Sequence, residues 1–155
     1  MKNVGRITWV RREALHLTLF FFPAADPVLE QRIASVLVPP LSVPAFELSF
    51  EGLGFFPSAK SPRVLWLGVG VGRNELVRLH AEIARRLDSV AAPEPFTPHL
   101  TLARFRERGK GVEMGRLASV EASAGPTWIE RVTLYESHLS PAGPVHEPRG
   151  EARLS

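Results

Sequence analysis

The chain has 155 residues, of which 45% are hydrophobic and 23% charged, and these proportions are typical of one soluble globular domain. Its formal net charge of +3 is too small to identify a partner, and the absence of cysteine excludes disulfides and thiolate metal sites. No apolar run reaches the ~18 residues of a membrane span, and the first residues lack the apolar stretch of a secretory signal, so we expect a cytoplasmic protein.

The first half of the chain shows strand signals around one helix. LHLTLFFF at 15–22 is rich in β-forming residues and ends at a proline, which predicts a strand. A helix is predicted over 26–37, because Asp26 suits the N-cap and a proline follows it. Two more strands are predicted at 46–56 and 63–72. The earlier one alternates in polarity and contains two glycines that favour a bulge, and the later one is a continuous apolar run.

The second half continues the alternation of helix and strand. Residues 75–87 place leucine and isoleucine at helical spacing and predict an amphipathic helix. A strand is predicted over 93–105 and a short helix over 114–122. Residues 128–139 predict another strand, and a last, weak strand is expected near 146–154. This mixture predicts an α+β fold with antiparallel sheets and helices packed outside.

The tetrapeptide His-Leu-Thr-Leu occurs twice, beginning at His16 and again at His99. Side chains alternate in a strand, so His16 and Thr18 would share one face, as would His99 and Thr101, with leucines on the other face. For one motif alone, a structural histidine is the commoner interpretation. Two copies in matching strand contexts, about half a domain apart, favour function and a two-lobed, pseudo-symmetric architecture.

Two imidazoles and two hydroxyls around one space suit the cleavage of a phosphodiester. One histidine can take a proton from the attacking water while the other gives a proton to the leaving oxygen. The reference pKa of imidazole, roughly 6.5, lets one ring be neutral and the other charged at the same pH. Threonine hydroxyls can donate hydrogen bonds to the non-bridging phosphate oxygens. This chemistry requires no metal.

The other histidines predict no further site. His80 falls within the amphipathic helix, where we expect it near the surface, while His138 ends a strand and His146 lies in a proline-rich tail. None has a partner at the H-x-x-x-H spacing of a zinc site. The glycines at 68–72 lack the G-x-G-x-x-G spacing of a dinucleotide cradle and predict a turn.

With the strand PRVLWLGV and the segment LYESHLSPAGP, the two motifs make this sequence resemble the 2H phosphoesterases. The resemblance is to the RNA 2′,3′-cyclic phosphodiesterases, also called LigT-like proteins or 2′-5′ RNA ligases, and it covers about residues 7–144. It implies a bilobal, pseudo-symmetric α+β fold whose antiparallel sheets line a central cleft. It also implies hydrolysis of the 2′,3′-cyclic phosphate at an RNA end to a 2′-phosphate, with no metal or cofactor.

The resemblance also implies a role for each matching residue. His99 would be the proton acceptor that activates water, and His16 the proton donor to the departing 3′ oxygen, although the near-symmetric motifs do not themselves distinguish the two roles. Thr18, Thr101 and Arg104 would hold the phosphate. Simple alternation from His99 aims Arg104 at the opposite face, so its role requires the strand to end or twist just before it.

The expected organisation is a single domain over residues 1–155, with two lobes divided near 57–62. Family members usually carry a strand and a helix before the first motif, whereas this chain begins almost at that motif. Either the native start lies upstream, or the protein lacks these elements. If it lacks them, we expect an exposed sheet edge in the first lobe, in a monomer or in a dimer that covers this edge. Two alternatives remain: a module that binds RNA ends or nucleotides without catalysis, and reversible 2′-5′ RNA ligation as a side activity.

Overall fold

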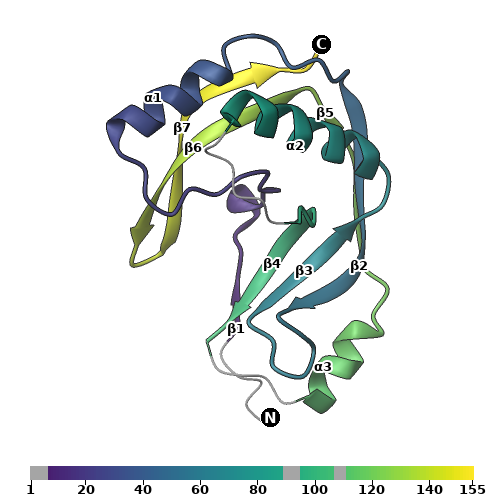
Figure 1. Cartoon of the computed structure of the whole chain (residues 1–155). Helices are drawn as coiled ribbons and strands as arrows, with labels where there is room; N and C mark the ends of the chain where they lie inside the picture. Colours follow the sequence, from purple (N-terminus) through teal and green to yellow (C-terminus); the bar gives the residue numbers. More distant parts are fainter. Residues whose placement is uncertain (1–6, 89–94, 107–110) are drawn as a thin grey trace. The chain divides into compact units, whose positions relative to one another are not determined.

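The computed structural model describes residues 7–88, 95–106 and 111–155 (Figure 1). Its elements, in chain order, are β1 (Ile7–Trp9), the 3-10 helix η1 (Arg12–Ala14), α1 (Pro27–Val36), β2 (Phe46–Phe56), β3 (Val64–Val69), α2 (Arg73–Leu87), β4 (His99–Phe105), α3 (Gly111–Ala118), β5 (Ser123–Ile129), β6 (Arg131–Ser140) and β7 (Gly143–Arg153). Helices and antiparallel strands are both present, so the predicted α+β class is confirmed.

The chain folds into two compact units, and each unit is assembled from three separate segments. Unit 1 comprises Met1–Thr18, Leu48–Val71 and Pro98–Pro126, and unit 2 comprises Leu19–Glu47, Gly72–Thr97 and Thr127–Ser155. The division expected near residues 57–62 does not coincide with a passage between the units. Those residues lie inside unit 1, in the turn between β2 and β3.

Unit 1 is built on a five-stranded sheet with the order β1-β4-β3-β2-β5. β1 pairs with β4, β4 with β3, and β3 with β2, all antiparallel. One face of the sheet carries a cluster of buried side chains, formed by Leu65, Ala103 and Phe105. Partly buried apolar side chains pack around this cluster: Ile7, Leu53, Phe55, Leu102 and Leu117. The opposite face of β3 and β4 is therefore available for polar groups.

The bulge predicted in β2 is confirmed at Gly52. The pairing of β2 with β3 shifts register between Glu51 and Leu53, and Gly52 has φ 77°, a conformation that side-chain-bearing residues rarely adopt. The Gly52 N–H donates to the Ala122 carbonyl at 3.1 Å, outside the ladder with β3. The bulge therefore turns one N–H of β2 toward the segment that precedes β5.

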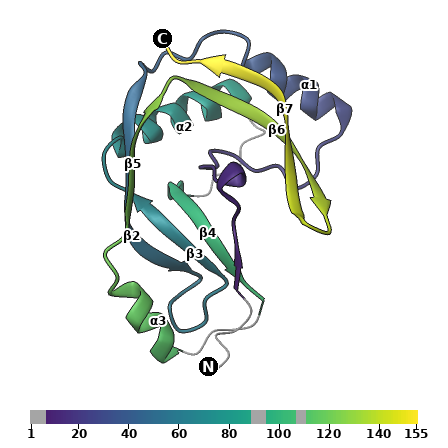
Figure 2. The same cartoon turned by 180° about the vertical axis from the view of Figure 1, so that it is seen from behind.

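Unit 2 contains α1, α2 and the β6–β7 hairpin, and α1 packs against both α2 and β7 (Figure 2). The predicted cap of α1 is confirmed, because Asp26 accepts a hydrogen bond from the Leu29 N–H at 2.8 Å. In α2, the leucine and isoleucine side chains at helical spacing are buried, as predicted. None of the helices in the described ranges is long and apolar enough to cross a membrane.

Hydrogen bonds from Arg86 of α2 hold the loop that follows α1. Its guanidinium donates to the carbonyls of Val36, Pro39 and Pro40 at 3.0, 2.7 and 2.6 Å, and to the Glu82 carboxylate at 2.7 Å. Carbonyls next to or within a proline-rich loop have few backbone N–H donors nearby, and the planar fork of arginine can serve several of them at once. This contact fixes the path of the loop toward β2.

Several sequence predictions of secondary structure were wrong. Residues 15–22 do not form a strand; only Leu17 makes an isolated bridge. Of the strand predicted over 93–105, residues 93–94 lie outside the described ranges, and β4 itself begins at His99, because Pro98 has no N–H for the ladder. The predicted strand at 128–139 is divided between β5 and β6, and the strand β1 was not predicted at all. Local sequence does not reveal which segment will find a pairing partner.

Candidate active site

The first three residues of the first His-Leu-Thr-Leu motif lie beside the second motif in unit 1. Leu17 and Leu100, the second residues of the two motifs, form an antiparallel bridge. In antiparallel pairing, His16 therefore stands at the register of Thr101, and Thr18 at that of His99. Opposed residues point to the same face of a sheet, so the two imidazoles and the two hydroxyls share one side while the leucines share the other.

The solvent exposure of the side chains agrees with an apolar face toward the core and a polar face away from it. Leu100 is buried, at 8% relative exposure, and belongs to the core. His16 and Thr18 are exposed, whereas His99 and Thr101 are half-buried. The predicted pairing of one imidazole with one hydroxyl on each segment is therefore present, and both pairs face away from the core.

The protonation of the His16 ring follows from a single contact. Nδ1 of His16 lies 2.7 Å from the carbonyl oxygen of Ala14 in η1. A carbonyl oxygen only accepts, so Nδ1 carries a hydrogen and donates it. Nε2 is then the nitrogen at which this imidazole gains or loses its second proton. A histidine held in this way is suited to proton transfer through one defined atom.

His99 begins β4 beside two aromatic rings. Its ring centroid lies 5.0 Å from that of Phe56, in an edge-to-face arrangement, and 6.0 Å from that of Trp66. Its partner in the ladder is Gly68 of β3, which has no side chain. The sequence reasoning did not identify Phe56 and Trp66 as neighbours of the site. A signal for Trp66 was present, because it occupies the strand PRVLWLGV that contributes to the family resemblance.

A bulge in β4 brings Arg104 to the same face as His99. Trp66 pairs with Thr101, whereas the preceding residue Leu65 pairs with Ala103, so Leu102 is an extra residue in β4. The extra residue reverses the alternation beyond it. Arg104, opposite Val64 of β3 and Thr8 of β1, then points to the face that carries Thr101.

The backbone change that a role for Arg104 required is therefore present near Ala103. The Arg104 side chain is exposed, and it forms no ion pair with any residue in the described ranges. An exposed guanidinium on the face of two imidazoles and two hydroxyls is suited to an anionic ligand.

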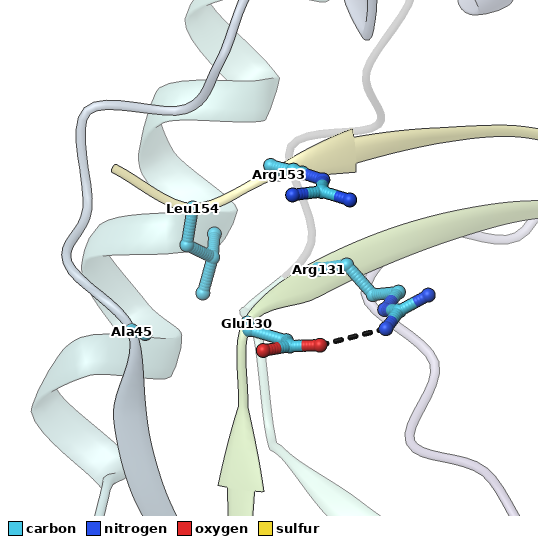
Figure 3. Close-up of a pocket in the computed structure, with 5 residues that line it drawn as sticks. All are labelled: Ala45, Glu130, Arg131, Arg153 and Leu154. Carbon is cyan, nitrogen blue, oxygen red and sulfur yellow. Dashed lines mark hydrogen bonds and ion pairs between the residues drawn. The ribbon is translucent and has the colours of Figure 1, made fainter.

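Two other groups of polar residues lie in unit 2 and contain none of the predicted site residues. A pocket of about 200 Å³ is lined by Ala45, Glu130, Arg131, Arg153 and Leu154 (Figure 3). Arg131 is already bound to Glu130 at 2.6 Å and to Glu151 at 3.5 Å. On the hairpin, Glu136, His138 and Glu147 come within 4.8 Å of one another. Arg149 already bonds to both of these carboxylates, so we interpret the group as an ion-pair network.

His80, expected near the surface of its helix, is half-buried, and it lies against aromatic rings that the sequence reasoning did not identify. The imidazole is stacked between Phe20 and Phe96, with centroid distances of 4.3 and 4.2 Å and ring planes within 8° of parallel. Burial between these rings lowers the pKa of His80. These neighbours were missed because helical spacing identifies the face that packs on the core but not aromatic side chains that arrive from distant segments.

The sequence matches the family described as the 2′-5′ RNA ligase superfamily over residues 4–140. The chain belongs to the 2′-5′ RNA ligase superfamily. Among its relatives is an RNA 2′,3′-cyclic phosphodiesterase of Thermotoga maritima, 32% identical over 154 residues that cover 95% of this chain and 79% of the relative. Another, of the same description, is from Methanothermobacter thermautotrophicus, 35% identical over 161 residues that cover 97% of this chain and 84% of the relative.

Solved structures share the superfamily fold with this chain. The crystal structure of TT0787 of Thermus thermophilus matches with a TM-score of 0.78 at 22% identity, covering 96% of this chain and 82% of that one. The Escherichia coli LigT structure with 3′-AMP matches with a TM-score of 0.71 at 25% identity, covering 98% and 82%. The predicted 2H phosphoesterase fold is therefore confirmed.

Proposed function

We propose that this protein is an RNA 2′,3′-cyclic phosphodiesterase, which opens a terminal cyclic phosphate to a 2′-phosphate and a free 3′ hydroxyl. The bridge between Leu17 and Leu100 is the observation that carries the proposal, because it brings the two H-x-T motifs to one face. Superfamily membership and the likeness to relatives described as RNA 2′,3′-cyclic phosphodiesterases support the same reaction. We further propose that it acts as a cytoplasmic monomer.

In the proposed reaction, water attacks phosphorus and the bond to the 3′ oxygen breaks. His99 accepts the proton that the water loses, and His16 donates a proton to the departing 3′ oxygen. The donor atom on His16 is Nε2, since Nδ1 is engaged with the Ala14 carbonyl. His99 takes up one proton and His16 releases one, so the two histidines together carry no net change in protons. The reaction consumes one water and leaves the phosphate on the 2′ oxygen.

The remaining three residues stabilise the negative charge that builds up on the phosphate. Thr18 and Thr101 donate hydroxyl hydrogen bonds to the non-bridging oxygens, from positions next to the two histidines. Arg104 supplies a positive charge on the same face, beyond the bulge. Family resemblance determines which histidine is written as acid and which as base, and the register of the two motifs is compatible with either order.

The test is an assay on a short RNA that ends in a 2′,3′-cyclic phosphate, run in EDTA, with products separated into 2′- and 3′-phosphates. We expect the 2′-phosphate to form, and His16→Ala and His99→Ala each to lower turnover by roughly 10²–10⁴-fold. His146→Ala, a change to a half-buried hairpin histidine outside the predicted site, is the matched control and should retain activity. Binding of the RNA without turnover by the folded wild type would contradict the proposal and favour a binding module.

A further inference from the structure

Phe56 and Trp66 form what we call the aromatic wall, which stands beside His99. The two rings contact each other, with centroids 5.0 Å apart, and each also contacts the imidazole. Trp66 lies opposite Thr101 in the ladder between β3 and β4, so the wall is on the same face as the H-x-T motifs. An imidazole that lies beside two aromatic rings has fewer accessible rotamers than an exposed one.

The position of the Trp66 indole depends on the residue beneath it. Gly54 of β2 is the ladder partner of Trp66. A Cβ added to Gly54 would lie 2.2 Å from Cζ2 and 2.3 Å from Cη2 of the indole, far inside van der Waals contact. The indole therefore lies directly on the backbone of β2, which only glycine at this position permits. Gly54 does not have a positive φ, so its backbone would tolerate alanine and the steric conflict is with Trp66 alone.

The indole N–H is an unfavourable feature of this arrangement. Nε1 of Trp66 is buried and has no hydrogen-bond acceptor in the part of the chain that the structure describes. An unsatisfied buried donor lowers stability, and a phenylalanine would avoid this loss. The buried N–H is therefore a cost of having Trp66 here, and an aromatic ring at this position is explained if it holds a neighbouring group in place.

We propose that Trp66, resting on Gly54, is a positioning residue that holds the His99 imidazole in the orientation required for proton transfer. The inference depends on the proposed function, in which His99 accepts the proton of the attacking water. Trp66 touches neither the water nor the phosphate in this scheme and acts only through His99. Misplacement of a catalytic group by ~1 Å can lower a rate about 10²-fold.

The test is a double-mutant cycle on kcat and KM for the cyclic-phosphate RNA. Gly54→Ala pushes the indole from its place, so we expect kcat to fall roughly 10- to 10²-fold while KM changes less than about twofold. Trp66→Ala should give a similar loss. In the Trp66→Ala background the steric conflict is gone, so adding Gly54→Ala should change kcat by less than about twofold. A folded Gly54→Ala protein with wild-type kcat would overturn the proposal.

Two further variants distinguish a positioning role of Trp66 from other causes of a lower kcat. Trp66→Phe keeps an aromatic ring on Gly54 and should retain kcat within about threefold of wild type. A folded Trp66→Phe variant as slow as Trp66→Ala would show that an aromatic ring in this place is not sufficient to position His99, and would overturn the proposal. Gly115→Ala, in the exposed part of α3 where an added Cβ meets nothing within 4 Å, is the control for a glycine-to-alanine change.

An NMR measurement keeps this inference distinct from the proposed function. The ring resonances of His99 report its placement against the aromatic wall through ring currents, whether or not the protein turns over RNA. We expect these resonances to shift in Gly54→Ala and Trp66→Ala, and to be unchanged in Gly115→Ala. Undiminished turnover in His99→Ala would defeat the proposed function, whereas unmoved His99 resonances in folded Gly54→Ala would defeat the positioning role.

Discussion

Leu17 pairs with Leu100 in an antiparallel bridge, and this contact places the exposed His16 at the register of Thr101. The bridge joins the first and last segments of unit 1, which are far apart in the sequence. Each leucine turns toward the core and leaves its neighbouring histidine and threonine on the other face. Backbone pairing at the two leucines therefore joins the motifs, and their histidines and threonines share one face.

The role of the two threonine hydroxyls can be tested by substitutions that remove the hydroxyl and change the shape of the side chain little. Thr18→Val and Thr101→Val keep a β-branched side chain but lose the hydrogen-bond donor. We expect each to lower kcat by roughly 10²-fold, because the donors act on charge that develops in the transition state. Single-turnover kinetics on the cyclic-phosphate RNA measure this loss. Thr127→Val, an exposed change in β5, is the control, and equal losses in all three variants would refute the assignment.

The bulge at Leu102 gives a prediction for Arg104. Arg104→Gln removes a charge from the face that carries His99, so we expect KM to rise about tenfold, with a smaller effect at high salt. Arg63→Gln, an exposed residue just before β3, makes the same charge change as a control. Steady-state kinetics at two salt concentrations distinguish the two variants. Equal rises in KM would mean that overall charge matters rather than the face on which Arg104 lies.

The stacked His80 makes the stability of the protein depend on pH. Burial lowers the pKa of His80 below the ordinary histidine value of 6.5, so between the folded and unfolded pKa values the unfolded chain binds more protons. The free energy of unfolding should therefore fall as pH decreases from about 6.5 toward the folded pKa. His80→Phe keeps three stacked rings without a titrating group and should lose less stability over this range. Urea unfolding at pH 7.5 and pH 5.5 measures the difference, and parallel losses in both proteins would contradict it.

Arg86 provides a test of how the loop after α1 is held. Arg86→Leu leaves three carbonyls and the Glu82 carboxylate without their donor, so we expect the free energy of unfolding to fall by about 2–3 kcal/mol. Arg85→Leu, the exposed neighbour, should change it by less than about 0.5 kcal/mol. Urea denaturation of both variants gives the comparison. An Arg86→Leu protein as stable as the Arg85→Leu protein would show that water replaces these contacts.

The features that the sequence predicted correctly depend on neighbours within a few positions along the chain. The spacing of Leu76, Leu79 and Ile83 predicted the buried face of α2, and Asp26 predicted the start of α1. Gly52 predicted the bulge in β2. The two H-x-T motifs also identified the family, which the comparisons confirm. The roles assigned to His16, His99, Thr18, Thr101 and Arg104 stay predictions until the variants are measured.

What only the tertiary structure decided involves partners that are remote in sequence. Residues 15–22 have the composition of a strand, yet only Leu17 pairs, because a ladder needs a second backbone at the right distance. The face of Arg104 depends on one extra residue in the pairing of β4 with β3, and strand alternation alone gives the wrong answer. The sequence by itself determined which groups can do the chemistry, since that depends on residue type. Their common face was decided by pairing between distant strands, whose register local preferences do not specify.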